Sequence, residues 1–72
     1  MERLTQLVKD NRYYIAEILR DLFGGVVVVL RWGSMKTEWE RKKEVPAKSQ
    51  AHAEVLFENA VSKKLRRGYR KV

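Results

Sequence analysis

The run VVVVL at residues 26–30 restricts the fold of this 72-residue chain more than any other feature. Consecutive β-branched residues are stiff in a helix and pack well on a pleated sheet, so the run predicts a strand. A pair of glycines, Gly24 and Gly25, precedes it, and before them comes the segment YYIAEILRDL at residues 13–22. We therefore expect a hairpin whose connection is the sequence DLFGG.

The segment at residues 13–22 has two interpretations. Its aromatic and branched residues favour a strand, but its apolar residues also recur at a helical spacing. Upstream, RLTQLV at residues 3–8 alternates weakly and predicts a short first strand, and Asp10 and Asn11 predict the turn that follows it.

The segment TEWERKKEV at residues 37–45 alternates in a different way, because both of its faces are largely charged or polar. Thr37, Trp39, Arg41, Lys43 and Val45 fall on one face. This pattern is typical of an exposed strand near an edge, where Lys and Glu discourage pairing between sheets.

Pro46 is expected to end the strands, and Ser49 is a plausible N-cap for a helix. Apolar residues then recur with helical spacing, and Gly68 suits the position just after the helix. The stripe consists of Ala53, Leu56, Phe57, Ala60, Val61 and Leu65. We expect one domain over residues 1–72 of class α+β: a small antiparallel sheet of three to four strands with one C-terminal amphipathic helix packed across it.

The residue inventory argues against an enzyme. There is no cysteine and only one histidine, His52, which falls in the first turn of the predicted helix and is expected at the surface. We expect no metal, no cofactor and no catalytic residues. The longest uncharged stretch, residues 22–30, is half of what a membrane-spanning helix needs, and no signal peptide is recognisable. The expected location is cytoplasmic, with no membrane partner.

Positive charge is the strongest global signal, with a net charge of +7. Residues 1–45 carry nine basic and seven acidic side chains, whereas residues 46–72 carry seven basic and two acidic ones. Six of those seven basic residues lie in KKLRRGYRK at residues 63–71. So dense a cluster attracts polyanions such as nucleic acid, although a solvated charged tail is the alternative.

The sequence RWGS at residues 31–34 poses the main functional question. Trp32 is either the last core residue of the strand or an aromatic surface offered to a ligand, and we expect a partly exposed ring that contacts nucleic acid. Of the two tryptophans, Trp39 is the better candidate for the core. Tyr69 lies inside the basic cluster and either contacts the ligand or folds back on the helix end.

Four segments in order give the chain a family resemblance: NRYY, DLFGG, VVLRWGS and the closing KKLRRGYR. Together they resemble the WGR domain, most closely its short bacterial members, over residues 3–71. The resemblance implies a small antiparallel sheet with one long helix. It also implies that the motif tryptophan, here Trp32, packs on the sugar of a terminal nucleotide, and that Asn11 and Tyr69 approach the 5′-phosphate.

The third residue of the motif differs from the family, which has arginine where this chain has Ser34. A serine cannot form the bidentate contact of a guanidinium with phosphate, but it can donate one hydrogen bond. Arg31 and Lys36 flank the position and are candidates to supply a cation.

We therefore expect a non-enzymatic module that binds DNA ends, nicks or distorted duplex with little sequence preference. The expected contacts are Asn11, Arg31, Trp32, Ser34, Lys36, Lys63, Lys64, Arg66, Arg67, Tyr69 and Arg70. The alternative is a protein-interaction module, or a homodimer, that uses the Trp32 edge of the sheet and has lost recognition of DNA ends. RNA or single-stranded DNA is a third candidate ligand for the same surface.

Overall fold

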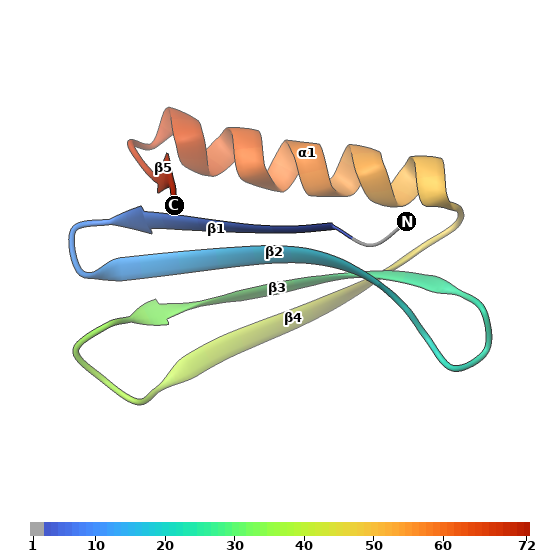
Figure 1. The fold of residues 1–72 in the computed structure, drawn as a ribbon, viewed down its shortest axis with the longest axis horizontal. Helices are drawn as coiled ribbons and strands as arrows, with labels where there is room; N and C mark the ends of the chain where they lie inside the picture. The colour runs from blue at the N-terminus through green and yellow to red at the C-terminus, as the bar shows by residue number, and fades with distance from the viewer. Residues whose placement is uncertain (1–2) are drawn as a thin grey trace.

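The computed structural model describes residues 3–72, and within them one helix lies across one face of a five-stranded sheet (Figure 1). The strands are β1 (Arg3–Lys9), β2 (Arg12–Arg20), β3 (Val26–Ser34), β4 (Glu40–Ala47) and β5 (Arg70–Lys71), and the helix is α1 (Gln50–Arg66). The strand order is β4-β3-β2-β1-β5, and every neighbouring pair is antiparallel. The expected α+β fold is confirmed, with the short strand β5 in addition to the predicted strands.

The hairpin between β2 and β3 has the expected DLFGG connection. The carboxylate of Asp21 accepts hydrogen bonds from the backbone N–H groups of Phe23 and Gly25, at 2.9 and 2.7 Å. Gly24 has a φ of +82°, which a residue without a side chain adopts readily. The two apolar residues of the tip, Leu22 and Phe23, are 97% and 96% exposed.

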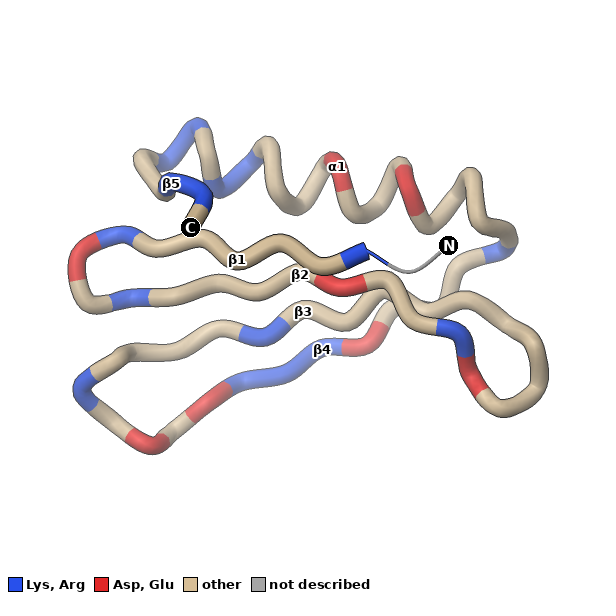
Figure 2. Tube along the Cα trace, viewed as in Figure 1, with Lys and Arg blue, Asp and Glu red and all other residues tan. Residues whose placement is uncertain are grey.

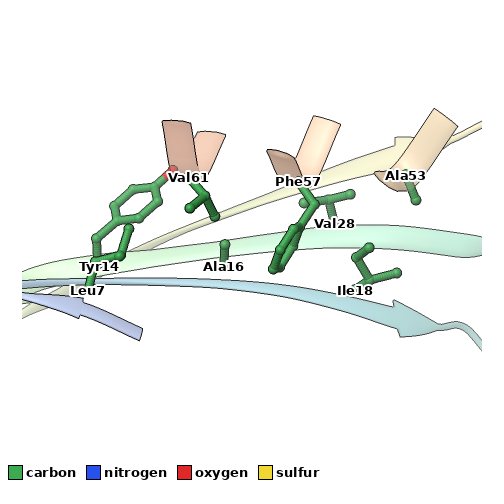
Figure 3. Close-up of a cluster of buried hydrophobic side chains, with 8 residues drawn as sticks. All are labelled: Leu7, Tyr14, Ala16, Ile18, Val28, Ala53, Phe57 and Val61. Carbon is green, nitrogen blue, oxygen red and sulfur yellow. The ribbon is translucent and has the colours of Figure 1, made fainter. Parts of the chain in front are cut away.

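The hydrophobic core lies between α1 and the face of the sheet that α1 covers (Figure 3). Pairing of β2 with β3 places Ile18 opposite Val28, and Phe57 of α1 reaches toward the sheet between them and Ala16. The buried cluster consists of Leu7, Tyr14, Ala16, Ile18, Val28, Ala53, Phe57 and Val61. Because side chains alternate along a strand, the same strands present their other residues on the opposite, uncovered face.

Both ends of α1 are capped as the sequence predicts. The hydroxyl of Ser49 accepts a hydrogen bond from the backbone N–H of His52 at 3.1 Å. At the other end, Gly68 adopts a φ of +97°, its N–H donates to the carbonyl of Leu65, and the N–H of Tyr69 donates to that of Lys64. This Schellman motif turns the chain back so that β5 pairs with β1.

Four details of the sequence prediction are wrong. The charged strand β4 begins at Glu40 rather than at residue 37, and it continues through Pro46 to Ala47. Proline is tolerated there because β4 is an edge strand, where an outward nitrogen needs no ladder partner. The strand β2 ends at Arg20 rather than at residue 22. Leu65, the last residue of the predicted apolar stripe, is 40% exposed and is not part of the buried core.

Phe57 is the core residue whose truncation we expect to be most costly, because it is 1% exposed and is the largest buried side chain of α1. Phe57→Ala is predicted to lower the free energy of unfolding by about 3–5 kcal/mol, measured by urea denaturation. The matched control is Val55→Ala on the exposed side of the same helix. Equal losses for the two variants would contradict the assigned core.

Candidate nucleic-acid interface

Trp32 lies on the helix-covered face of the sheet, beyond the part that α1 covers most fully. It is four residues after the buried Val28 on β3 and is paired with Tyr14 of β2, so all three share a face. The rings of Trp32 and Tyr14 stack with their centroids 6.1 Å apart and their planes at 27°. Trp32 is partly exposed, as expected, and packs against the core with one side. It is not the last residue of the strand, because β3 continues to Ser34.

An open hollow of about 420 Å³ lies beside Trp32, and we call it the end hollow. It lies where β2, β3, the loop after β3 and the C-terminal end of α1 meet. Its lining residues are Arg12, Tyr13, Trp32, Gly33, Ser34, Thr37, Trp39, Lys64 and Tyr69. Three sequence-predicted residues besides Trp32 therefore meet here: Ser34, Lys64 and Tyr69.

Gly33 allows the backbone at Trp39 and the side chain of Tyr13 to approach β3 closely. A Cβ atom at this position would lie 2.8 Å from the carbonyl oxygen of Trp39 and 2.9 Å from the hydroxyl of Tyr13. Trp39 itself is 61% exposed, and the guanidinium of Arg41 lies 4.8 Å from its ring centroid. The prediction that Trp39 belongs to the core is therefore wrong, because its ring lies outside the hydrophobic cluster at the margin of the end hollow.

A second hollow of about 350 Å³ lies on the other side of Trp32, and we call it the helix groove. It runs between the C-terminal half of α1 and the strands β3 and β4. Its lining residues are Tyr14, Leu30, Trp32, Lys43, Lys63, Lys64 and Arg67. Trp32 and Lys64 line both hollows, so the two are adjacent and share a wall.

Lys64 is the central cation of this surface. Its Nζ lies 4.8 Å from the ring centroid of Tyr14 and 5.4 Å from that of Tyr69. Burial lowers the pKa of Lys64, and repulsion from Arg67, Lys63 and Arg12 lowers it further. A phosphate placed between these cations would relieve the repulsion, so the local electrostatics favour an anion.

The two turns at the same end of the sheet are joined to each other. The backbone N–H of Met35 donates to the carbonyl of Asn11 at 2.6 Å, which holds the β1–β2 turn beside the loop after β3. The hydroxyl oxygen of Ser34 accepts from the N–H of Lys36 at 3.2 Å, which leaves the Ser34 O–H available as a donor. The structure therefore brings Asn11, Ser34 and Lys36 together at one end of the sheet, where Ser34 lines the end hollow but Asn11 and Lys36 do not.

Three predicted contacts lie elsewhere. Arg31 points to the opposite face from its neighbour Trp32, and its guanidinium lies 3.6 Å from the carboxylate of Glu17. Arg70 is paired with Val8 and shares that opposite face, and Arg66 lines neither hollow. The resemblance and the charge cluster predicted these residues as contacts. Strand alternation places Arg31 and Arg70 on the uncovered face of the sheet, and the position of Arg66 on α1 keeps it out of both hollows.

Sequence reasoning missed several residues of the two hollows: Arg12, Tyr13, Thr37, Trp39 as a site residue, and Lys43. A signal for Lys43 was present, since it falls on the same face of the strand as the apolar residue Val45, which packs against the core. Lys43 is paired with Leu30 and faces α1, whereas its neighbour Lys42 faces the other way and pairs with Glu44 at 3.0 Å.

Charge is divided along the helix, as the coloured trace of Figure 2 shows. Basic residues gather at its C-terminal end, beside Trp32. The acidic residues Glu54 and Glu58 lie farther toward its N-terminus and pair with Arg3 at 2.6 and 3.0 Å. Among residues 3–72, no carboxylate lines either hollow.

Residues 3–72 contain no group of three or more His, Cys, Asp or Glu side chains arranged to hold a metal ion. Within the same residues, the helix is too short and too polar to cross a membrane.

Gly33→Ala tests the close approach that shapes the end hollow. The added methyl group would collide with the Trp39 carbonyl, so we expect the free energy of unfolding to fall by about 1–3 kcal/mol in urea denaturation. Ser34→Ala, at the next position, is the control and is expected to cost much less. If both variants unfold at the same urea concentration, the backbone approach at Gly33 is looser than described.

Comparison with known proteins finds one match. A family model described as the WGR domain matches residues 1–72, the whole chain. No curated protein and no solved structure matches it.

Proposed function

This chain belongs to the WGR domain family, a family of nucleic-acid-binding-type modules, and we propose that it binds DNA at duplex ends and nicks without catalysing a reaction. We place its action in the cytoplasm. DNA backbone contacts position a protein without reading sequence, so little sequence preference is expected.

One observation carries the proposal: a partly exposed tryptophan stands between two hollows that are lined by cations and by no carboxylate among residues 3–72. The cations Arg12, Lys63, Lys64 and Arg67 suit phosphates, and aromatic rings suit a sugar or a base. Inside a continuous duplex the bases are stacked on both sides. An exposed base or sugar is available at an end or a nick, which is why Trp32 favours such sites.

Each residue has a proposed role. Trp32 packs on the terminal sugar or base, while Asn11, Ser34 and Tyr69 approach the terminal phosphate. The helix-end cations Lys63, Lys64 and Arg67 contact the backbone, and Lys36 contacts it from the loop after β3. Arg31 and Arg70 are left out because both lie on the opposite face of the sheet, and Arg66 is left out because it lines neither hollow.

Arg12 supplies the guanidinium that the family motif places at the position of Ser34. Arg12 is the cross-strand partner of Ser34, and both line the end hollow. An arginine at this position can donate two parallel hydrogen bonds to a phosphate, which serine cannot do. The loss of the motif arginine therefore need not abolish the recognition of a DNA end.

Trp32→Leu tests the role of the ring while keeping an apolar side chain against the core. We expect binding to a 5′-phosphorylated open duplex to weaken by about 1–3 kcal/mol, the usual contribution of a stacked base. Binding to the same duplex closed by hairpin loops should change little. Fluorescence anisotropy with both DNAs measures this, and an equal loss on the two would refute end recognition by Trp32.

Lys63→Gln tests the backbone contacts. Removing one phosphate contact should reduce the slope of log K against log salt concentration by about 0.9, equally for open and closed duplexes. Arg70→Gln removes the same charge from the opposite face and should leave the slope unchanged. If the two variants behave alike, binding depends on net charge rather than on this surface.

A protein-docking role is the second candidate. The sequence predicts docking at the Trp32 edge of the sheet. However, β3 is an interior strand that pairs with β4 on one side and β2 on the other, so Trp32 does not lie at an edge. The observation that favours docking is instead the exposed pair Leu22 and Phe23 at the far hairpin tip. If the tip docks a second copy, sedimentation equilibrium should show an association that the double variant Leu22→Ser, Phe23→Ser abolishes. A wild-type chain that remains monomeric would refute docking of a second copy through this hairpin tip.

A further inference from the structure

We propose that the helix groove binds the unpaired nucleotides of a single-stranded extension that continues from a DNA end. The inference rests on the proposed function, because the terminal sugar or base of the duplex part of the same DNA would occupy the end hollow. It adds a second ligand, unpaired strand, and a second set of residues, centred on Lys43.

The first reason is continuity. The two hollows meet at Trp32 and Lys64, which line both of them. A strand whose last paired sugar packs on Trp32 therefore enters the helix groove as soon as its partner strand ends. Its phosphates remain within reach of Lys64 as it passes from one hollow to the other.

The second reason is the chemistry of the groove. One wall is the end of α1, with Lys63, Lys64 and Arg67, and the other wall is β4, with Lys43. Between them lies an apolar floor formed by Tyr14, Leu30 and Trp32. Cations on two opposite walls with an apolar floor between them match an unpaired nucleotide, whose flat base is exposed and whose phosphate is charged.

The third reason is size. The groove has a volume of about 350 Å³, which is typical of a small-ligand site and far too small for a duplex. A single nucleotide matches such a space in size. Duplex DNA would contact only the rim, so the groove discriminates between paired and unpaired strand.

Lys43 is the residue whose role this inference explains. It faces the groove from the edge strand, opposite Leu30, and has no ion-pair partner within residues 3–72. Its neighbour Lys42 has the same charge and is also exposed, but it faces the opposite side of the sheet and pairs with Glu44. The two lysines form a natural matched pair for an experiment.

The experiment compares three DNAs by fluorescence anisotropy: a hairpin with one blunt 5′-phosphorylated end, and the same hairpin with a three-nucleotide extension on its 5′ or its 3′ strand. For the wild-type chain, either the 5′ or the 3′ extension should tighten binding by about fivefold or more. Fivefold corresponds to the lower limit of the affinity gained from stacking one base. Lys43→Gln should remove that gain and leave blunt-end binding unchanged. Lys42→Gln should change neither quantity.

Three outcomes would overturn this inference and leave the proposed function standing. Equal binding of the blunt and the extended DNAs would show that the groove does not take unpaired strand, and equal effects of the two lysine variants would show that Lys43 has no special role. Adenosine monophosphate serves as a competitor: if it removes the gain at micromolar concentration, the groove is a free-nucleotide site instead. Failure to bind any of the three DNAs at low salt would overturn the proposed function itself.

Discussion

The alternation of side chains along the paired strands β2 and β3 is the constraint on which the rest of this structure depends. It places Ile18 and Val28 against Phe57 in the core, and four residues later it places Trp32 on the same face as Val28. A slip of one residue in this register would expose the core and move Trp32 to the opposite face. The register that stabilises the domain is therefore also the register that positions its candidate ligand-binding ring.

The helix contributes to the fold and to the site with different parts of its length. Its middle covers the core through Phe57, while its last turns carry cations past the covered region toward Trp32. Gly68 makes this division possible, because its positive φ ends the helix and brings Tyr69 beneath Lys64. The negative end of the helix is stabilised by the same lysines and arginines that face the two hollows. A single helix thus provides both stability and the polyanion-binding surface.

Most of the fold was predictable from the sequence because its signals are local. The valine run, the DLFGG hairpin, Ser49 as N-cap and Gly68 after the helix are each set by nearby residues. The site was harder to predict because it depends on register between distant segments. Charge and resemblance alone brought Arg31 and Arg70 into the site, and only the pairing of β3 and β5 shows that both face away. Pairing likewise places Arg12 beside Ser34, and it places Lys43 on the face of the sheet that α1 covers. The strand β5 could not be predicted because it is only two residues long, too short for a sequence pattern to be visible.

The most direct test of the account is a ¹H–¹⁵N correlation spectrum of the labelled chain, titrated with a 5′-phosphorylated blunt hairpin DNA. The account predicts that the largest shifts belong to the indole N–H of Trp32 and to the backbone N–H groups of Ser34, Lys64 and Tyr69, all at one end of the helix-covered face. Shifts centred instead on Glu17, Val29 and Arg31 of the uncovered face would contradict the central claim that Trp32 and the end of α1 form the DNA-binding surface.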